Sequence, residues 1–288
     1  MRYSQLRAFH HVAVHGGFSS AARALNQSQP ALSDQVRQLE QLHDTLLFYR
    51  ENRHVRLTEA GNELFLLTRQ FFDVEEQIGD CLSQHRQQLA GTLRVVADSA
   101  LHITDSLRAF REANPNALVA IQKGNSEEVL QRLRHYDAEI GVVGNISPAP
   151  DLIEIPIGQA QIVAIMARGF LPDTVESLDC KALSDLPLIF RETGSSTQRC
   201  LDAWAKVERL VLRPVITVEG REALREVVKS GAGIGFVSRA ELGNDINIRA
   251  LPLAGATLEM KESLVFLSMR RDLLMIRAFL RCIEIGNT

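Results

Sequence analysis

The chain has 288 residues and a mass of 32.1 kDa, enough for about two domains with cores that need no disulfide or metal. Apolar residues make up 45% and charged residues 23% of the sequence, which excludes an extensively disordered chain. The net charge of −3 argues against a wholly basic nucleic-acid coat or a polybasic membrane protein.

That charge is distributed unevenly. Residues 1–57 carry seven arginines against four acids, a net charge of +3, whereas residues 58–90 carry −4 and residues 91–288 carry −2. The first lysine is Lys123, so every Lys or Arg charge before it comes from arginine. Arginine suits bidentate contacts with phosphate and guanine. The sequence therefore predicts a small basic module attached to an acidic remainder.

The first 40 residues predict three short helices. Their expected N-cap residues are Ser4, Ser19 and Ser28, because a serine hydroxyl can accept a free N–H of the first helical turn. Gly16 and Gly17 are expected to end the first helix.

The third of these helices has an apolar and a polar face. The inward set is Leu32, Val36 and Leu39, and the outward set is Gln29, Ser33 and Arg37. Glutamine and arginine read adenine and guanine edges in the major groove, so the pattern favours a helix-turn-helix. An ordinary helical bundle with a solvated face is the alternative that periodicity alone leaves open.

A short β-hairpin is predicted next. The apolar residues 46–49 on one side and Val55 and Leu57 on the other flank a polar turn, and Arg50, Arg53 and Arg56 cluster near its tip. Beside a helix-turn-helix, such a hairpin is typical of a wing that touches phosphates or the minor groove. The alternative is a solvated turn.

A long helix follows, with Thr58 as its N-cap and Gly91 after its end. Its apolar residues recur at spacings of 3, 4, 3, 4 and 3, which is a heptad pattern. They are Leu64, Leu67, Phe71, Val74, Ile78 and Cys81. This stripe predicts a coiled coil with a second copy of the chain, and packing on the chain's own next domain is the alternative.

From residue 92 onward, strands and helices alternate. This alternation predicts α/β units with mostly parallel sheets, arranged as two lobes with a cleft between them. The expected strands are 93–97, 118–122, 140–143, 188–190, 215–218 and 234–237, and the expected helices are 102–113, 126–134, 197–207 and 221–230.

Neither an enzyme nor a metal protein is expected. Ser195 and Ser196 do not lie in a GxSxG setting, and the pair His11 and His15 lacks an acidic or cysteine partner. The four cysteines form no CxxC pair, which fits buried thiols in a reducing compartment. With no apolar signal segment or membrane-length run, we expect a cytoplasmic protein without a catalytic site, metal or cofactor.

The stretch Gln5 to Gly61 closely resembles the LysR-type transcriptional regulators. The resemblance is carried by LRAFHHVAVHGGFSSAARAL, SQPALSDQVRQLE and LLFYRENRHVRLTEAG. GNSEEVLQRL, DAEIGVV, DLPLIFRETGSSTQRCL and GREALREVVKSGAGIGFV follow in the order expected of that family. Within the family, the chain is similar to the subgroup associated with aminoethylphosphonate catabolism.

The resemblance implies an α/β protein. Its residues 1–57 would form an N-terminal winged helix-turn-helix that is all-α apart from the wing, and residues 58–90 would form a dimerising linker helix. It also implies a two-lobed type-2 periplasmic-binding-protein-like effector domain over 91–288. Lobe 1 would comprise about 91–163 and 265–288, and lobe 2 about 164–264. The implied partners are double-stranded promoter DNA, a small effector and further copies of the chain in a homotetramer, with RNA polymerase as another candidate and no membrane.

The family's DNA-contacting residues map onto the predicted reading helix and wing. Gln29, Pro30 and Ser33 match the groove-facing positions, Arg53 matches the wing cation, and Arg37 and Arg50 lie on the same surfaces. Asp34 replaces the basic residue often found after the serine. A carboxylate repels phosphate but accepts a hydrogen bond from cytosine N4, so an altered base preference is expected.

The implied effector site lies between the lobes, at loops that precede helices. Free N–H groups, hydroxyls and an arginine there suit an oxyanion. The candidate residues are Asp98, Ser99, Ala100, His102, Asn125, Ser126, Arg191, Glu192, Ser195, Ser196, Thr197 and Arg221. Helix capping alone is the alternative role of the hydroxyls.

The chemistry of the effector stays open at the level of sequence. A phosphonate or another oxyanion is expected, and a carboxylate metabolite is the rival. A ligand with both an anion and an ammonium would also use the acids Asp98 and Glu192. An effector-free architectural DNA-binding protein is a further alternative.

Overall fold

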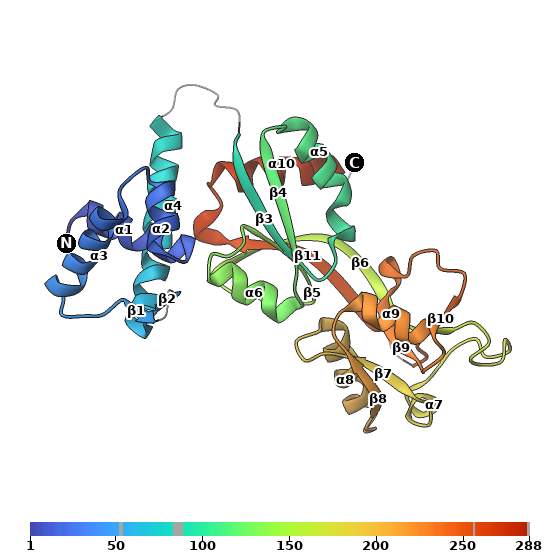
Figure 1. Cartoon of the computed structure of the whole chain (residues 1–288). Coiled ribbons are helices and arrows are strands. Elements are labelled where there is room, and N and C mark those ends of the chain that lie inside the picture. Colours follow the sequence, from blue (N-terminus) through green and yellow to red (C-terminus); the bar gives the residue numbers. More distant parts are fainter. Residues whose placement is uncertain (52–53, 83–88, 256, 287–288) are drawn as a thin grey trace. The chain divides into compact units, whose positions relative to one another are not determined.

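The computed structural model of the chain describes residues 1–51, 54–82, 89–255 and 257–286 (Figure 1). The chain divides into two compact units, Met1–Arg86 and Gln87–Thr288. Of the described helices, none combines the length and the apolar composition that crossing a membrane requires.

The N-terminal unit begins with the three expected helices. Their bounds are α1 (Tyr3–His15), α2 (Phe18–Ala24) and α3 (Gln29–Leu42). They share one core, in which Phe9 and Val12 of α1 and Leu32 and Val36 of α3 are fully buried. The short turn between α2 and α3 and the close packing of both confirm a helix-turn-helix arrangement.

The ends of these helices confirm one expected N-cap and correct two. The Ser28 hydroxyl accepts the Ala31 N–H at 3.4 Å and caps α3. Ser4 and Ser19 are not N-caps, because α1 and α2 begin before them. At α1 the Gln5 side chain instead accepts the backbone N–H of the residue that precedes the helix, at 2.8 Å.

The hairpin and the long helix also form. Strands β1 (Phe48–Glu51) and β2 (His54–Leu57) pair antiparallel, and α4 covers Glu59–Leu82. Thr58 caps α4, since its hydroxyl accepts the Gly61 N–H at 2.9 Å. Glu40, buried at the end of α3, accepts the N–H groups of Leu47 and Phe48 at 2.9 and 3.2 Å. This buried carboxylate attaches the hairpin to the third helix.

The second unit contains the expected alternation of strands and helices. Its first half comprises β3 (Gly91–Ala97), the 3₁₀ helix η1 (Ala100–Ile103), α5 (Thr104–Ala113), β4 (Ala117–Lys123), α6 (Ser126–Arg134), β5 (Ile140–Gly144) and β6 (Leu152–Ala167). Its second half comprises α7 (Cys180–Ser184), β7 (Leu188–Arg191), α8 (Ser196–Val207), β8 (Pro214–Val218), α9 (Arg221–Lys229), β9 (Gly235–Ser238), η2 (Arg239–Glu241), β10 (Ile248–Pro252), β11 (Glu259–Leu267), η3 (Ser268–Arg270) and α10 (Leu274–Gly286).

The expectation of mostly parallel sheets is wrong. Within the described residues, the main sheet has the order β10-β6-β11-β5-β3-β4, with β9 also paired to β6. In this sheet β3 pairs parallel with β4 and β5, whereas β6 and β11 run antiparallel to each other and to their other neighbours. The reason is that β6 and β11 are long strands that pass between the two lobes in opposite directions. In lobe 2, β7 and β8 form a separate parallel pair.

Lobe 1 buries its sheet on both faces. Val95 on β3 and Leu264 on β11 face a core shared with α5 and α10, in which Phe110 and Phe279 stack edge to face. Their neighbours Val96 and Val265 face the opposite core beneath α6. Because side chains alternate along a strand, this two-sided burial explains why the strands are continuous apolar runs in the sequence.

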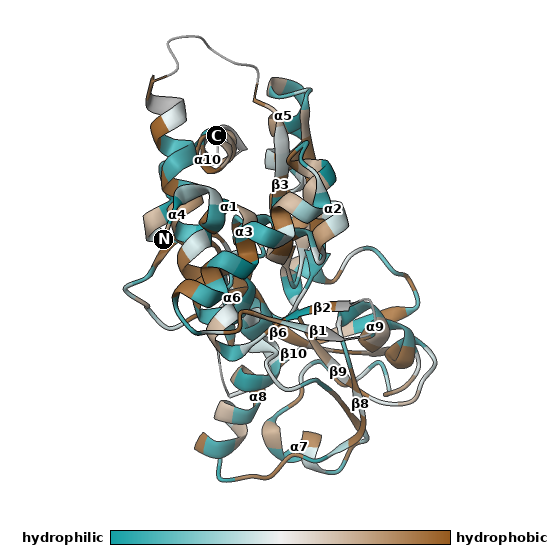
Figure 2. Ribbon diagram, turned by 60° about the vertical axis from the view of Figure 1, so that its left-hand side comes forward, coloured by the Kyte–Doolittle hydropathy of each residue, from teal (hydrophilic) through white to brown (hydrophobic). Residues whose placement is uncertain are grey.

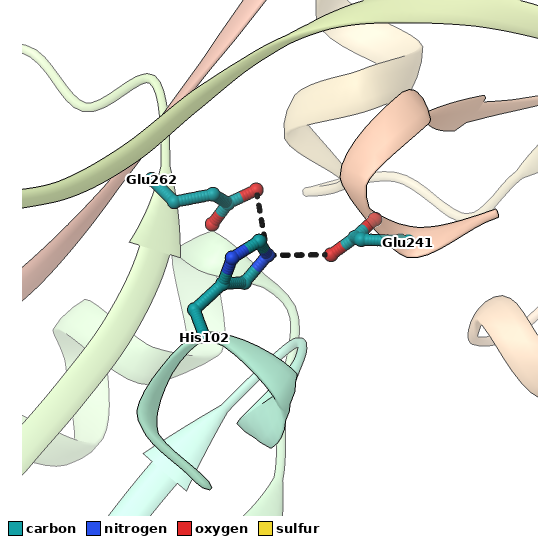
Figure 3. Close-up of side chains that lie close together, drawn as sticks. All are labelled: His102, Glu241 and Glu262. Atoms are coloured by element: carbon teal, nitrogen blue, oxygen red, sulfur yellow. Dashed lines mark hydrogen bonds and ion pairs between the residues drawn. The ribbon is translucent and has the colours of Figure 1, made fainter. Parts of the chain in front are cut away.

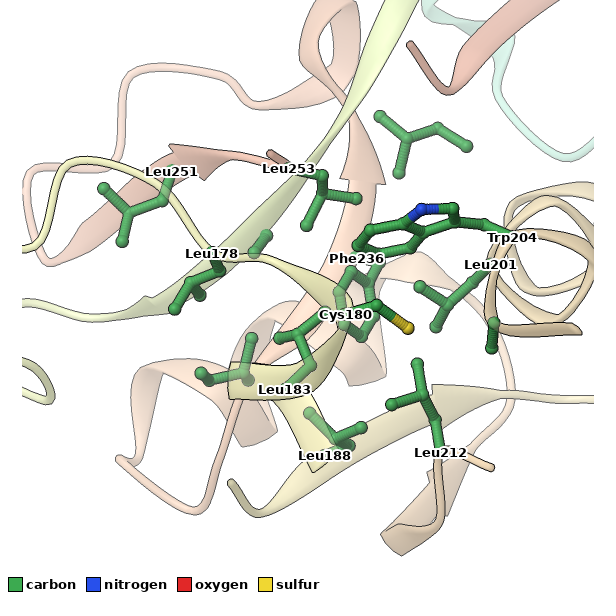
Figure 4. Close-up of a cluster of buried hydrophobic side chains, with 14 of the residues drawn as sticks. Leu178, Cys180, Leu183, Leu188, Leu201, Trp204, Leu212, Phe236, Leu251 and Leu253 are labelled. Carbon is green, nitrogen blue, oxygen red and sulfur yellow. The ribbon is translucent and has the colours of Figure 1, made fainter. Parts of the chain in front are cut away.

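Lobe 2 also has a hydrophobic core on each face of its sheet, around the C-terminal part of β6. Ile162, Ala164 and Met166 face the core beneath α8, which also holds Trp204 and Cys180 (Figure 4). The intervening residues on β6 face α9. The change of partner occurs at residue 162, since β6 pairs with β11 up to Gln161 and with β9 and β10 beyond it. One strand thus belongs to both cores.

Gly141 provides a test of the tight packing between β5 and α6. A Cβ atom there would clash with Val129 Cγ1 and would lie 3.0 Å from Leu133 Cδ1. Gly141→Ala should lower the free energy of unfolding by about 1–3 kcal/mol through overpacking. Urea unfolding of the full chain measures this. Gly158→Ala is the matched control, because its Cβ would meet nothing closer than 3.8 Å; equal stabilities of the two variants would contradict the prediction.

Candidate functional site

The outward face of α3 carries the predicted DNA-contacting residues. Gln29 and Pro30 lie exposed at its first turn, and Ser33 lies half-buried one turn later. Asp34 and Arg37 are exposed and form an ion pair at 2.8 Å. The acid that departs from the family pattern therefore holds the neighbouring guanidinium on the same face.

The structure describes two of the three predicted wing arginines. Arg50 lies on β1 opposite Val55, and Arg56 lies exposed on β2. Arg53 lies outside the described residues, so its assignment as the wing cation stays a prediction.

The heptad stripe of α4 is exposed along most of its length. Leu64 packs on the helix-turn-helix core, but Leu67, Phe71, Val74 and Ile78 are 45–61% exposed. Figure 2 shows brown, hydrophobic segments recurring along α4 between teal ones. A surface helix with such a stripe needs a partner to cover it.

The histidines of α1 have a structural role. His10 hydrogen-bonds to Thr68 of α4 at 3.0 Å, and its ring packs on Phe72. Burial, with the nearby charge of His11, lowers the pKa of His10 to about 4. His10 is therefore a neutral ring packed against α4.

In the second unit, Arg191 joins residues of both lobes. It ends β7 in lobe 2, is almost fully buried, and donates to Asp98 of lobe 1 at 3.0 Å and to Glu192 at 2.8 Å. Burial alone would raise the pKa of Glu192. The hydrogen bonds from Arg191 and from the Gly220 N–H outweigh that effect and lower this pKa to about 2. Glu192 is therefore ionised.

Asp98 extends this network toward a second cluster. It also faces Arg221, the first residue of α9, at 3.5 Å, and Arg221 in turn contacts Glu241 of η2 at 2.8 Å. Glu241 lies 3.2 Å from His102 of η1, and Glu262 of β11 lies 3.9 Å from the same ring nitrogen (Figure 3). Both η2 and β11, which are distant in sequence from η1, thus bring a carboxylate to His102.

This second cluster is perturbed electrostatically. Burial, and then the charge of Glu241, raise the pKa of Glu262 to about 7. Burial lowers the pKa of His102, but the hydrogen bond to Glu241 and both carboxylate charges outweigh it and raise that pKa. The donor atoms of His102, Glu241 and Glu262 lie within 4.8 Å of one another. In the described part of the chain, this is the group that could hold a cation.

Hydroxyl groups form a separate polar contact between the lobes. Ser126 at the start of α6 and Ser196 at the start of α8 are buried, and their Oγ atoms are hydrogen-bonded at 2.8 Å. The Ser196 hydroxyl also contacts the Gly144 carbonyl and the Arg199 guanidinium. Two helix N-termini from different lobes therefore face each other across a pair of hydroxyls.

The other predicted site residues divide by role. Asn125 caps α6 and donates to the Thr193 carbonyl across the lobes at 3.3 Å. Ser195 is fully buried and caps α8. Ser99 and Thr197 lie buried beside these groups, and Ala100 of η1 offers no polar side-chain atom.

A cavity of about 750 Å³ opens between the lobes next to these residues. Its lining includes Asn125 and Glu192 from the predicted set, together with Lys123, Thr193 and Gly220. The Gly220 backbone approaches Lys123 so closely that a Cβ atom would clash with its Nζ. Glycine is favoured at residue 220 because its φ of +79° is left-handed, whereas the flexible Lys123 side chain could move away from a Cβ atom.

Sequence reasoning missed four charged residues of this region: Lys123, Arg199, Glu241 and Glu262. Glu241 and Arg199 belong to no motif that would single them out. Glu262 is a buried acid at a register shift between Glu262 and Ser263, but its strand begins with the exposed residues Glu259 and Lys261, so the sequence alone did not mark it as buried. A buried charge in a strand is rare without a function or a partner.

Comparison with protein families agrees with this architecture. Residues 3–62 match the bacterial regulatory helix-turn-helix protein, lysR family, and residues 86–285 match the LysR substrate binding domain. The chain belongs to the LysR family of transcriptional regulators. The family is one of DNA-binding regulators with an effector-binding domain, not of enzymes.

Individual relatives of this LysR-family chain are distant. It is 28% identical over 252 residues to the transcriptional activator IlvY of Salmonella typhimurium, covering 85% of this chain and 84% of IlvY. A full-length OxyR variant of Pseudomonas aeruginosa has the same fold, with a TM-score of 0.81, 20% identity, and coverage of 99% of this chain and 95% of OxyR. CbnR in complex with its target DNA has a TM-score of 0.65 and 20% identity, with 99% and 100% coverage.

The Glu192 ion pairs predict a specific pH dependence of stability. Because the pKa of Glu192 falls from 4.5 to about 2 on folding, its contribution is present above pH 4.5 and is lost as the pH falls toward 2. The stability difference between the wild type and Glu192→Gln should therefore shrink across this window, measured by urea unfolding at a series of pH values. The control is Glu176→Gln, an exposed residue with no ion pair among those described for the chain. Parallel curves for wild type and Glu192→Gln would refute the assignment.

Proposed function

We propose that this regulator binds promoter DNA under the control of a small anionic effector, such as a phosphonate or another oxyanion, bound between the lobes of residues 91–288. The observation that carries the proposal is the meeting of the α6 and α8 N-termini at Ser126 and Ser196, 2.8 Å apart, with Arg199 beside them. Helix N-termini and hydroxyls donate hydrogen bonds to oxyanions. A carboxylate metabolite is the second candidate, because the same donors would serve it.

An effector between the lobes provides a physical mechanism of control. The Ser126 and Ser196 hydroxyls now bond to each other across the lobes, and Asn125 donates to the Thr193 carbonyl. A ligand that inserts between them and binds one lobe arrangement more tightly shifts the population toward that arrangement. In a homotetramer this would re-space the paired DNA-binding units and change the bend of the promoter.

The same proposal assigns one role to each of three parts of the chain. Residues 1–57 bind DNA, residues 58–90 dimerise, and residues 91–288 bind the effector in a cytoplasmic protein. Gln29, Pro30 and Ser33 would face the major groove, with Asp34 and Arg37 beside them and Arg50 and Arg53 on the wing. Their exposure on one face of α3 supports this assignment for the helix residues.

Two substitutions on α3 test the DNA surface. Ser33→Ala should change base preference by about 1–3 kcal/mol at one position. Arg37→Ala should weaken binding to all sequences and reduce the salt dependence by about one phosphate contact. The measurement is fluorescence anisotropy at several salt concentrations, on duplexes selected by the wild type from a random library.

Arg108→Ala is the matched control for Arg37→Ala. Arg108 forms the same kind of exposed pair with an acid three residues away, but in the second unit. DNA binding by this control should equal that of the wild type. If Arg37→Ala changes only the sequence preference, its assignment as a phosphate contact is wrong.

Leu67 tests the dimerising role of α4. Its side chain is 61% exposed in the single chain, so Leu67→Asp should leave the fold of the subunit intact while placing a charge in the shared seam. Sedimentation should show dissociation of the dimer, with DNA affinity falling by at least about tenfold because two linked units bind more tightly than one. Asn62→Asp adds the same charge on the opposite side of α4 and should change neither; an unchanged mass for Leu67→Asp would contradict the role.

A further inference from the structure

The inner part of the interlobe site contains more buried negative than positive charge. Its carboxylates are Asp98, Glu192, Glu241 and Glu262, and its guanidiniums are Arg191 and Arg221. With all four carboxylates ionised and His102 neutral, the excess would be two negative charges; the raised pKa values of Glu262 and His102 show that bound protons offset part of it. Uncompensated buried charge is unfavourable, so this arrangement favours a cation from outside the chain.

The excess is concentrated at Glu262. Arg191 forms ion pairs with Asp98 and Glu192, and Arg221 forms ion pairs with Asp98 and Glu241. The Glu262 side chain is only 9% exposed, and its nearest ionic neighbour is His102 Nε2 at 3.9 Å. No residue that the structure describes donates a hydrogen bond to this carboxylate. Figure 3 shows Glu262 and Glu241 approaching His102 from two sides.

The spacing of these groups suits a primary ammonium. A hydrogen bond from an ammonium to a carboxylate is about 2.8 Å long, and the N–H bonds diverge at the tetrahedral angle, so one nitrogen can bridge two oxygens about 4.6 Å apart. The acceptor atoms of the cluster lie within 4.8 Å of one another. A divalent metal fits less well, because the Arg221 guanidinium lies 2.8 Å from the Glu241 oxygen that faces His102 and repels a dication about twice as strongly as a single ammonium charge.

We propose that Glu262 and Glu241 bind a primary ammonium group of the effector, with Asp98 adding negative charge nearby. The inference rests on the proposed function, since it takes the space between the lobes as the effector site. It narrows the effector to a small zwitterion, whose anionic end lies at Ser126 and Ser196. Because Glu241 belongs to lobe 2 and His102 to lobe 1, the ammonium would stabilise the closed lobes.

Matched ligand pairs test this proposal on the full-length chain. The pairs are 2-aminoethylphosphonate and ethylphosphonate, 3-aminopropionate and propionate, and taurine and ethanesulfonate, with zinc chloride alone as a further probe. Titration calorimetry and thermal unfolding give the affinities. At least one amine should bind about tenfold or more tightly than its amine-free partner, as expected for a charge-assisted hydrogen bond.

Substitutions test whether Glu262 is the group that binds the ammonium. Glu262→Gln removes the charge with little change of shape, so it should reduce amine affinity by about tenfold or more and leave the amine-free affinity unchanged. Without ligand, its melting temperature should equal or exceed that of the wild type, because an unpaired buried charge is relieved. Glu222→Gln, which alters an exposed pair with Lys123 at the rim, is the control and should change none of these values.

Three results would overturn the proposal. The first is that no amine binds more tightly than its partner. The second is that zinc alone binds the wild type but not Glu262→Gln, which would make the cluster a metal site. The third is a lower melting temperature of ligand-free Glu262→Gln, which would make Glu262 a structural ion-pair partner. DNA binding and its response to the amine-free anions, measured in parallel, show whether the proposed function fails as well.

Discussion

The two strands β6 and β11 are the constraint on which the second unit depends. Each passes from one hydrophobic core to the other, so the lobes are joined by continuous hydrogen-bonded backbone. Along β6 the sheet partners change at residue 162 while the side chains keep alternating between two buried faces. The polar groups at the lobe edges are therefore positioned by two strands that enter both cores.

Buried ion pairs then determine the chemistry between the lobes. Arg191 and Arg221 are each shared by two carboxylates, and Asp98 of lobe 1 accepts a hydrogen bond from Arg191 and forms an ion pair with Arg221. The arginines that sequence reasoning assigned to an anionic ligand are therefore already engaged by the chain's own acids. Hydroxyls and helix N-termini at Ser126 and Ser196 provide the oxyanion donors instead. The sites for the two signs of charge are separate, which is why a ligand carrying both signs suits this region.

The N-terminal unit uses charge and hydrophobicity in a different way. Its core is closed by Glu40, whose buried carboxylate holds the hairpin against α3. The outward face of α3 is left polar, and most of the α4 stripe is left apolar and exposed. One surface is suited to phosphate and base edges and the other to a second helix. The net charge of −3 hides this, because the acidic helix and the acidic second unit outweigh the arginine-rich head.

The sequence by itself determined the elements whose signals are local. Apolar periodicity with the Ser28 and Thr58 caps predicted α3 and α4, Gly16 predicted the end of α1, and the alternation of strands and helices predicted α6 and the two-lobed α/β order. The DNA-binding motif identified the family. Tertiary structure alone decided the antiparallel course of β6 and β11 and the cluster around His102, which joins Glu241 and Glu262 from distant segments. Strand direction and ion pairing depend on contacts between residues far apart in the chain. The spacing of residues within one segment predicts which face of a helix is buried, but it does not predict contacts with distant segments.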